Sequence, residues 1–268
     1  MTRAWLLGGA LLALASTWAF ADERVITIPT RAGVTESYIL LATDDAPKKV
    51  VAVTFVGGQG LIRLARRAEH PPLVFGKETN SLVRIRNLLV NADIADVIVD
   101  SPSDRQQAGM DDTFRAGSDH AADIRAVIGD VRKRYPDSRF FLVGTSRGTI
   151  SAANLGVSLH DVVAGAILTS TVTHWDKMGI ALSQFDFAAL KVPTLLIHHV
   201  DDGCFTSPYA GASALAPRFP LVSAKGGDAP ESGPCDPLAP HGFYGLDAQV
   251  ATVMQQFMLG QPYSRTIP

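Results

Sequence analysis

Short, strongly apolar runs alternate along the chain with segments whose apolar residues recur at helical spacing. Apolar runs bounded by turn residues are typical of strands that are buried on both faces of a sheet. Buried strands are therefore predicted at 49–56, 96–100, 140–143, 162–168, 193–200 and, from a weaker pattern, 220–224. The segments between them predict amphipathic helices, with apolar faces made by Leu82, Ile85, Leu88 and Leu89, by Ile124, Val127, Ile128 and Val131, and by Leu246, Val250, Val253 and Phe257.

Two further strands precede this pattern, at 24–30 and 34–42, and predict an antiparallel hairpin at the edge of the sheet. Strands that alternate with helices are typical of a mostly parallel sheet covered by helices on both faces. No linker or internal repeat interrupts the alternation, so we expect residues 22–268 to form a single α/β domain. Residues 61–79 fit neither pattern and are predicted to form a surface excursion, while 101–117 are predicted to form a polar loop before a helix N-cap at Ser118.

Composition and charge narrow the class of function. The chain of 268 residues is 47% hydrophobic and 19% charged, and its formal net charge is −2, which is typical of a globular protein. Proteins that bind nucleic acid carry a basic face. Nucleic acid is therefore not an expected partner.

The first residues have the pattern of a secretory signal peptide. Arg3 precedes an apolar run at 5–15, and Ala19-Phe20-Ala21 places small residues before a cleavage site at Asp22. The apolar run is too short to span a bilayer. We expect residues 1–21 to be removed and the mature chain to be exported, to the periplasm or outside the cell, without further membrane association. An uncleaved anchor is the alternative.

Export would determine the oxidation state of the two cysteines, Cys204 and Cys235. Disulfides persist in exported proteins, so we expect these two residues to form a disulfide. Two buried free thiols are the alternative. A zinc site made by both cysteines with His199 and Asp201 is a further alternative, but its spacing matches no zinc signature. No metal or cofactor is expected.

The segment 144–148 reads Gly-Thr-Ser-Arg-Gly and lies between an apolar strand and a helix-compatible run of small residues. A Gly-x-Ser-x-Gly sequence in this context is the mark of a nucleophile elbow. The flanking glycines let the strand and helix approach closely, and the helix N-terminus behind Ser146 offers free N–H groups to an oxyanion. We therefore predict that Ser146 is a nucleophile. The alternative is a plain tight turn between strand and helix.

With this motif after the third predicted buried strand, residues 22–268 resemble the α/β-hydrolase family. The resemblance implies that family's fold, with a mostly parallel sheet, and a catalytic triad in the order serine, acid, histidine. In the family an apolar strand is followed by His-Gly, two variable residues and the acid. Segment 198–202 reads His-His-Val-Asp-Asp, which selects Asp202, although His199 stands in place of the glycine. Asp201 remains an alternative, as does a loop without a catalytic role.

The base is expected after the last strand and before the final helix, where His241 stands in a Pro-His-Gly-Phe loop. Among the other histidines, His70, His160 and His174 are predicted to be surface or loop residues. His120 follows Asp119 at a helix start and is predicted either to be a simple exposed residue or to act as a ligand or substrate contact.

The oxyanion formed during acyl transfer needs two backbone donors. The resemblance implies one from Arg147, which follows the nucleophile, and one from Gly58 or Gln59 in the glycine-rich turn at 57–60. A plain strand-end turn is the alternative. The segment 57–60 is not a phosphate loop, because no Gly-Lys-Ser/Thr follows. The Arg147 side chain is expected either to face substrate or to anchor the elbow by pairing with an acid.

Only a short connection separates the strands at 162–168 and 193–200, long enough for one helix, so a minimal lid is expected. Residues 61–79 and 101–117 remain candidates for a partial wall. Together these features predict a secreted serine hydrolase, a carboxylesterase that cleaves small soluble esters through an acyl-enzyme. The alternatives are a non-catalytic binding protein on the same fold, or a peptidase, thioesterase or acyltransferase that uses the same residues.

Overall fold

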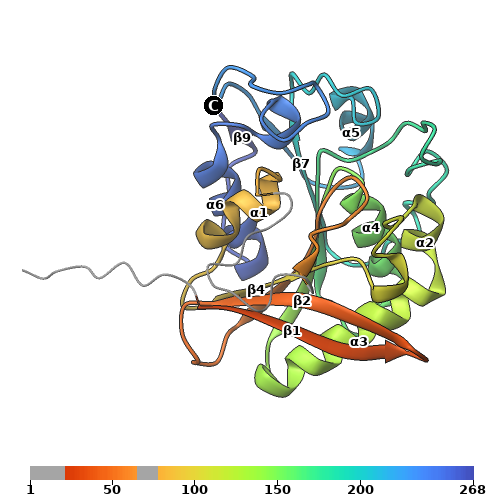
Figure 1. The fold of residues 1–268 in the computed structure, drawn as a ribbon. Helices are drawn as coiled ribbons and strands as arrows, with labels where there is room; N and C mark the ends of the chain where they lie inside the picture. The colour runs from red at the N-terminus through yellow and green to blue at the C-terminus, as the bar shows by residue number, and fades with distance from the viewer. Residues whose placement is uncertain (1–21, 65–77) are drawn as a thin grey trace, which may run out of the picture.

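The computed structural model describes residues 22–64 and 78–268 (Figure 1). Nine strands form one sheet in the order β1-β2-β4-β3-β5-β6-β7-β8-β9. The strands are β1 Asp22–Arg31, β2 Val34–Ala42, β3 Val50–Phe55, β4 Ile94–Val99, β5 Arg139–Thr145, β6 Gly165–Thr169, β7 Thr194–His199, β8 Leu221–Ala224 and β9 Thr266–Ile267. Strand β2 is antiparallel to β1 and β4, and every other pairing is parallel, as the pattern predicted.

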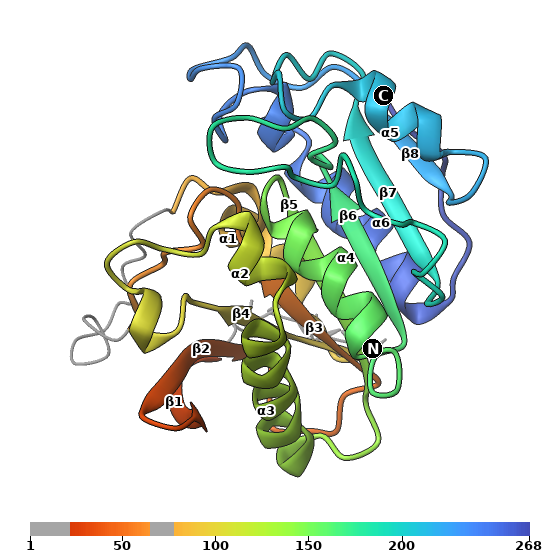
Figure 2. The same cartoon turned by 90° about the vertical axis from the view of Figure 1, so that its right-hand side faces the viewer.

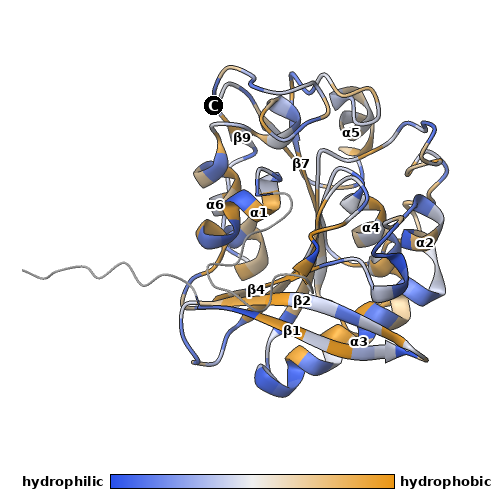
Figure 3. Ribbon diagram, viewed as in Figure 1, coloured by the Kyte–Doolittle hydropathy of each residue, from blue (hydrophilic) through white to orange (hydrophobic). Residues whose placement is uncertain are grey.

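Helices cover both faces of the sheet (Figures 1 and 2). They are α1 Ser81–Leu89, α2 Asp112–Ala116, α3 Ser118–Arg134, α4 Gly148–Ser158, α5 Tyr209–Leu215 and α6 Asp247–Leu259, with short 3₁₀ turns at η2 Ser103–Arg105 and η3 Pro240–Gly242. Helices α3 and α4 pack on one face, and α1 and α6 pack on the other. Figure 3 shows the apolar positions concentrated in the central strands, which is why the short strands were visible in the sequence.

The predicted edge hairpin is confirmed, because β1 lies at one end of the sheet beside β2. At the other end the prediction was incomplete. The chain returns after α6 and adds β9 next to β8, so the strand near 220 is not the last one. A strand of two residues has no hydrophobic pattern long enough to detect.

Two segments differ from their predicted character. Leu61, Ile62 and Leu64 are buried, so the predicted surface excursion begins inside the core, and residues 65–77 lie outside the described part of the chain. The predicted polar loop at 101–117 contains η2 and α2, and Asp111 caps α2 by accepting from the Phe114 N–H at 2.7 Å. The segment therefore folds into short helices, and at least one of its polar side chains caps a helix.

Two smaller predictions were wrong, and a third segment adds a detail. The N-cap of α3 is Gly117, and Ser118 lies inside the first turn. Leu88 is 46% exposed, on the solvent side of α1, whereas its predicted partners are buried. The connection between β6 and β7, described throughout, contains turns and no helix. Its small size agrees with a minimal lid.

Within the described ranges, none of the helices is both long and apolar enough to cross a bilayer.

Candidate active site

The carboxyl ends of the parallel strands bring the predicted residues together. Ser146 follows β5, Asp202 lies in the turn after β7, and His241 lies in η3. In open parallel sheets this edge is where ligands bind. Sequence positions almost 100 residues apart therefore meet because of strand order alone.

Ser146 occupies the strained turn that the motif predicted. Its φ is 51°, a left-handed conformation that is rare for residues with a Cβ. The flanking glycines are required by close backbone contacts. A Cβ on Gly144 would lie 2.4 Å from the Gly148 carbonyl oxygen, and a Cβ on Gly148 would lie 2.0 Å from the Phe55 carbonyl oxygen. The strained turn presents the serine at the start of α4.

Asp202, not Asp201, contacts the histidine. The Nδ1 atom of His241 lies 3.0 Å from Oδ2 and 3.3 Å from Oδ1 of Asp202, and both side chains are buried. Asp201 is exposed, and its backbone N–H donates to Nδ1 of His199 at 3.1 Å. His199, the residue in the glycine position, thus shapes the turn that directs Asp202 inward.

The Asp202 carboxylate is ionised in spite of its burial. Burial alone would raise its pKa, but hydrogen bonds from His198 and His241, and from the backbone N–H of Cys204 at 2.9 Å, outweigh burial and hold the pKa far below its usual value. A negative charge is therefore available to pair with the Nδ1 side of His241. Such a charge favours the tautomer that leaves Nε2 as an acceptor.

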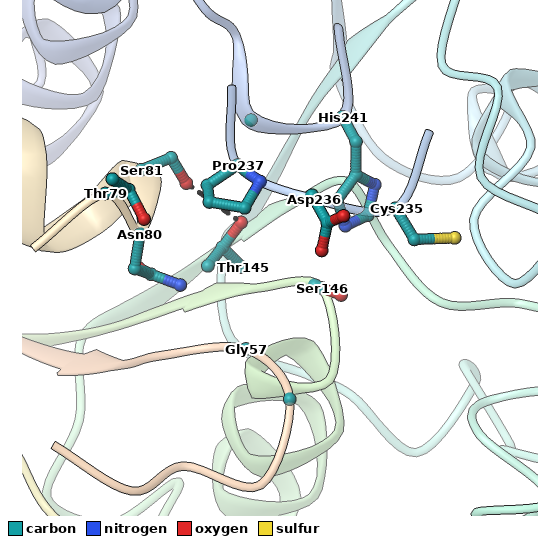
Figure 4. A pocket seen from close by; sticks show the side chains of 12 residues that line it. Gly57, Thr79, Asn80, Ser81, Thr145, Ser146, Cys235, Asp236, Pro237 and His241 are labelled. Carbon is teal, nitrogen blue, oxygen red and sulfur yellow. Dashed lines mark hydrogen bonds between the residues drawn. The ribbon is translucent and has the colours of Figure 1, made fainter. Parts of the chain in front are cut away.

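Ser146 and His241 line the same cavity, which has a volume of about 290 Å³ (Figure 4). The lining residues are Gly57, Gly58, Thr79, Asn80, Ser81, Thr145, Ser146, Cys235, Asp236, Pro237, His241 and Gly242. In the view of Figure 4 the imidazole lies above the serine. Among the described hydrogen bonds, none joins Ser146 Oγ directly to His241. Catalytic hydrogen bonds are often long before substrate binds and shorten in the reactive complex.

The two candidate loop donors differ in their position relative to the cavity. Gly58 lines the cavity with Gly57, whereas Gln59 does not. A Cβ on Gly57 would lie only 3.0 Å from Cβ of Ser146, so the turn approaches the elbow closely. The Gln59 side chain instead donates to the Ala108 carbonyl oxygen at 3.0 Å. The glycine-rich turn is therefore a wall of the cavity as well as a strand end.

The side chain of Arg147 anchors the elbow and does not line the cavity. It is only 6% exposed and forms ion pairs with Asp112 and Asp176. Burial opposes its charge, but hydrogen bonds to the two carboxylates raise its pKa. One of the two roles expected from the sequence is therefore observed, namely pairing with acids.

Arg115 lies behind the glycine-rich turn. It is fully buried, donates to the Gly58 carbonyl oxygen at 3.0 Å, and donates to Ser151 Oγ in α4 at 2.8 Å. Burial lowers its pKa to about 10, so the guanidinium remains charged at neutral pH. This side chain ties the loop that carries Gly58 to the helix behind the nucleophile.

Neither sequence alternative for His120 is correct. The ring is fully buried beside Phe55 and Phe114, and both of its nitrogens lack a hydrogen-bond partner in the described structure. Burial lowers its pKa to about 3, so the imidazole is neutral. His160 and His174 are exposed, while His70 lies outside the described residues.

The predicted disulfide between Cys204 and Cys235 is present. It joins the turn that carries Asp202 to the loop that precedes His241, and Cys235 also lines the cavity. Bonded sulfurs are not thiolate ligands, so the zinc alternative is wrong. Within the residues that the structure describes, no group of three or more His, Cys, Asp or Glu side chains is arranged to hold a metal ion.

Several contacts around the site were not anticipated. Ser207 contacts both Asp202 and His241, and Ser170 donates to the His241 carbonyl oxygen at 2.6 Å. A serine several residues after an acid carries no pattern of its own. Arg115 was missed because it lies in the segment interpreted as a polar loop.

A family model described as "Serine aminopeptidase, S33" matches residues 83–218. No match was found among curated proteins.

Solved structures resemble the chain over most of its length. A serine hydrolase without lid from Xanthomonas campestris shares 16% identity with a TM-score of 0.58, and covers 96% of this chain and 100% of that one. Est1E from Butyrivibrio proteoclasticus, with ferulic acid bound, shares 15% identity with a TM-score of 0.60, covering 88% and 98%. A dienelactone hydrolase from Anabaena variabilis shares 12% identity with a TM-score of 0.58, covering 90% and 98%. At these identities the likeness concerns the fold.

Proposed function

The chain belongs to the α/β-hydrolase family, and from that premise we propose that it is a serine hydrolase that cleaves carboxylic esters. In this proposal Ser146 is the nucleophile, His241 the general base and Asp202 the acid that orients the base. One observation carries the proposal. A buried, ionised carboxylate holds Nδ1 of a histidine that shares a cavity with a serine on a strained turn.

The chemistry proceeds in two halves. Ser146 Oγ attacks the ester carbonyl carbon while Nε2 of His241 takes its proton. Asp202 stabilises the imidazolium through the Nδ1–H bond. The alcohol leaves with a proton from His241, and an acyl-enzyme remains. Water, activated by the same histidine, then releases the acid and restores the serine.

The negative charge on the tetrahedral oxygen is proposed to be bound by the backbone N–H groups of Arg147 and Gly58. Both groups belong to segments that other side chains hold in place, since Asp112 pairs with Arg147 and Arg115 binds the Gly58 carbonyl oxygen. A preorganised donor of this kind is worth about 3 kcal/mol of transition-state stabilisation. That contribution requires a fixed distance between the turn that carries Gly58 and the elbow that carries Arg147.

Small, soluble esters are the proposed substrates. The cavity of about 290 Å³ is lined mainly by small and polar residues, and no residue of the connection between β6 and β7 is among them. Both features support short acyl groups and a site that is open without a lipid interface. The ferulic acid in the structural neighbour makes hydroxycinnamoyl esters a useful member of any substrate panel.

An aminopeptidase is the second candidate, and the description of the matched family favours it. An amine-terminated substrate would need a carboxylate near the nucleophile. Asp236 is exposed and lines the cavity near His241 (Figure 4). Binding without catalysis, and thioester or acyl-transfer chemistry, remain outcomes of the test.

The test starts with covalent labelling. The chain from residue 22 onward is incubated with a fluorophosphonate probe and digested for mass spectrometry, with Ser146→Ala as the negative control. Ser138→Ala is the matched control, because Ser138 is buried at the opposite end of β5. An adduct on Ser146 in the wild type and in Ser138→Ala is expected. Absence of an adduct on Ser146 in the wild type would refute the nucleophile assignment.

A substrate panel then separates the candidates. It contains short-chain p-nitrophenyl esters, hydroxycinnamoyl esters, thioesters, and amino-acid anilides with free or blocked amino groups. Faster turnover of esters than anilides supports the esterase. Faster turnover of free-amine anilides, lost in Asp236→Asn, supports the aminopeptidase. Equal background rates in the wild type and in Ser146→Ala would support a binding protein.

Export is also proposed, and residues 1–21 lie outside the described structure. The disulfide supports it, because such bonds persist in oxidising compartments. N-terminal sequencing of protein recovered from the periplasm or medium is expected to begin at Asp22. Recovery only from the cytoplasm, with Met1 retained, would refute the proposal.

A further inference from the structure

Ser207 occupies an unusual place between the acid and the base. Its hydroxyl is fully buried, donates to Asp202 Oδ2 at 3.1 Å, and lies 3.0 Å from Nδ1 of His241. Asp202 Oδ2 is itself 3.0 Å from the same nitrogen. The three polar atoms therefore form a closed triangle rather than a linear pair.

The three groups of the triangle have enough donor hydrogens and acceptor lone pairs to form all of these hydrogen bonds at once. Ser207 gives its single hydroxyl hydrogen to the carboxylate, so its oxygen keeps lone pairs that accept from the imidazole N–H. The Nδ1–H of His241 thereby has two acceptors on one side of the ring, Ser207 Oγ and Asp202 Oδ2. A ring held by two acceptors has less freedom to tilt or flip than a ring held by one.

Ser207 is fixed in turn by its own backbone. Its N–H donates to the Cys204 carbonyl oxygen at 3.1 Å, and its carbonyl oxygen lies 2.8 Å from Nε2 of His198. The same His198 nitrogen is 3.2 Å from Asp202 Oδ2. His198 thus binds both the acid and the residue that bridges the acid to the base.

The base is also held from its backbone side. Ser170, at the end of β6, has a φ of 46° and donates its hydroxyl to the His241 carbonyl oxygen at 2.6 Å. Its strained conformation is retained because the surrounding structure imposes it. Ring and backbone of His241 are therefore fixed by side chains from two different strand ends.

We propose that Ser207 is a positioning residue, which locks the imidazole of His241 onto the Asp202 carboxylate and keeps the opposite ring nitrogen directed at the cavity. The inference rests on the proposed function of Ser146 and His241. Its physical consequence is specific: loss of the Ser207 hydroxyl leaves substrate binding intact and slows the step in which the base takes a proton from Ser146.

The experiment compares Ser207→Ala, Ser207→Thr and the matched control Ser138→Ala. Ser138 is also a buried serine with one hydrogen bond from its side chain to a backbone carbonyl oxygen, but it lies at the far end of the sheet. Initial rates are measured with the best ester of the panel, after the folded fraction has been fixed by circular dichroism and active-site titration.

Ser207→Ala is expected to lower kcat about tenfold or more, which corresponds to about 1.4 kcal/mol, with KM unchanged within about twofold. Ser138→Ala is expected to keep wild-type kcat, and Ser207→Thr is expected to recover most of it. A kcat for Ser207→Ala within twofold of wild type would overturn the inference. So would an equal loss in Ser138→Ala. If Ser207→Thr does not fold, the split between kcat and KM in the alanine variant decides.

A measurement without turnover separates this inference from the proposed function. The Nδ1–H proton of His241 is followed by NMR, assigned by its loss in His241→Gln. In Ser207→Ala its resonance is expected to shift and to exchange faster with water. An unchanged resonance would overturn the role of Ser207 even if esters are hydrolysed. Failure of Ser146 to label, with the resonance altered, would overturn the proposed function and not the triangle.

Discussion

Asp96 offers a quantitative test of how burial in this sheet changes the pKa of a carboxyl group and, through it, the stability of the fold. The residue lies in β4 with no exposure, and its Oδ1 accepts from the Thr54 hydroxyl at 2.6 Å. Its Oδ2 has no hydrogen-bond partner in the described structure. Burial raises its pKa from 3.8 to about 7, against smaller opposing effects of Thr54 and the neighbouring backbone. The perturbation is Asp96→Asn, which removes the titration and keeps the shape.

The sign follows from proton binding. Between pH 3.8 and about 7 the folded state holds a proton that the unfolded chain has lost, so folding stability falls as pH rises. Each pKa unit is worth 1.36 kcal/mol, so the full loss is about 4 kcal/mol for the wild type at and above neutral pH. In Asp96→Asn this loss is absent. The free energy of unfolding of the variant, relative to that of the wild type, is therefore expected to increase by about 4 kcal/mol between pH 4 and pH 8.

The assay is urea unfolding at intervals from pH 4 to pH 8, without reductant, for both proteins. The quantity compared is the difference in free energy of unfolding, because other titrating groups cancel in it. Thr54→Val is a control that removes the hydrogen bond at Oδ1 and leaves the carboxyl group in place. A difference between wild type and Asp96→Asn that stays constant across this pH range would refute the reasoning.

Two further predictions concern the edge that carries the site. Replacing Cys204 and Cys235 by serine is expected to lower ester turnover per folded molecule about a hundredfold, because a misplacement of about 1 Å between acid and base has that effect. Ester turnover normalised to the folded fraction measures this loss. A lower thermal midpoint with intact turnover would contradict the prediction. Arg147→Ala leaves the buried Asp112 carboxylate unpaired and is expected to lower the free energy of unfolding by about 3–5 kcal/mol with KM unchanged. Urea unfolding and steady-state kinetics test this, and a raised KM with unchanged stability would instead place the guanidinium against substrate.

Much of the fold was predictable because its signals are local. The strands at 49–56 and 193–200 are short apolar runs, and the elbow at 144–148 combines a strand, two glycines and a helix. The residue order of the α/β-hydrolase family then indicated Asp202 and His241, and the structure brings their side chains together. Their catalytic roles remain predictions.

The contacts that were missed depend on long-range packing. Nothing near Ser207 or Ser170 in the sequence indicates that both reach His241, because their partners come from other strand ends. Arg115 resembles any solvent-exposed arginine in a polar segment, yet the fold buries it completely. For His120 the local pattern was misleading, since its position at a helix start does not reveal the aromatic rings that enclose it.

The bond between Cys204 and Cys235 has a mechanical consequence. Asp202 and His241 lie on segments that are stapled together, whereas Ser146 belongs to the elbow between β5 and α4. The bond therefore limits how far the turn of Asp202 and the loop of His241 can separate. Ser146 reaches the same region only through the end of β6, because its N–H donates to the Thr169 carbonyl oxygen at 3.0 Å and the neighbouring Ser170 holds the His241 backbone. We expect motion of the cavity walls to change the gap between Ser146 and His241 more than the gap between His241 and Asp202.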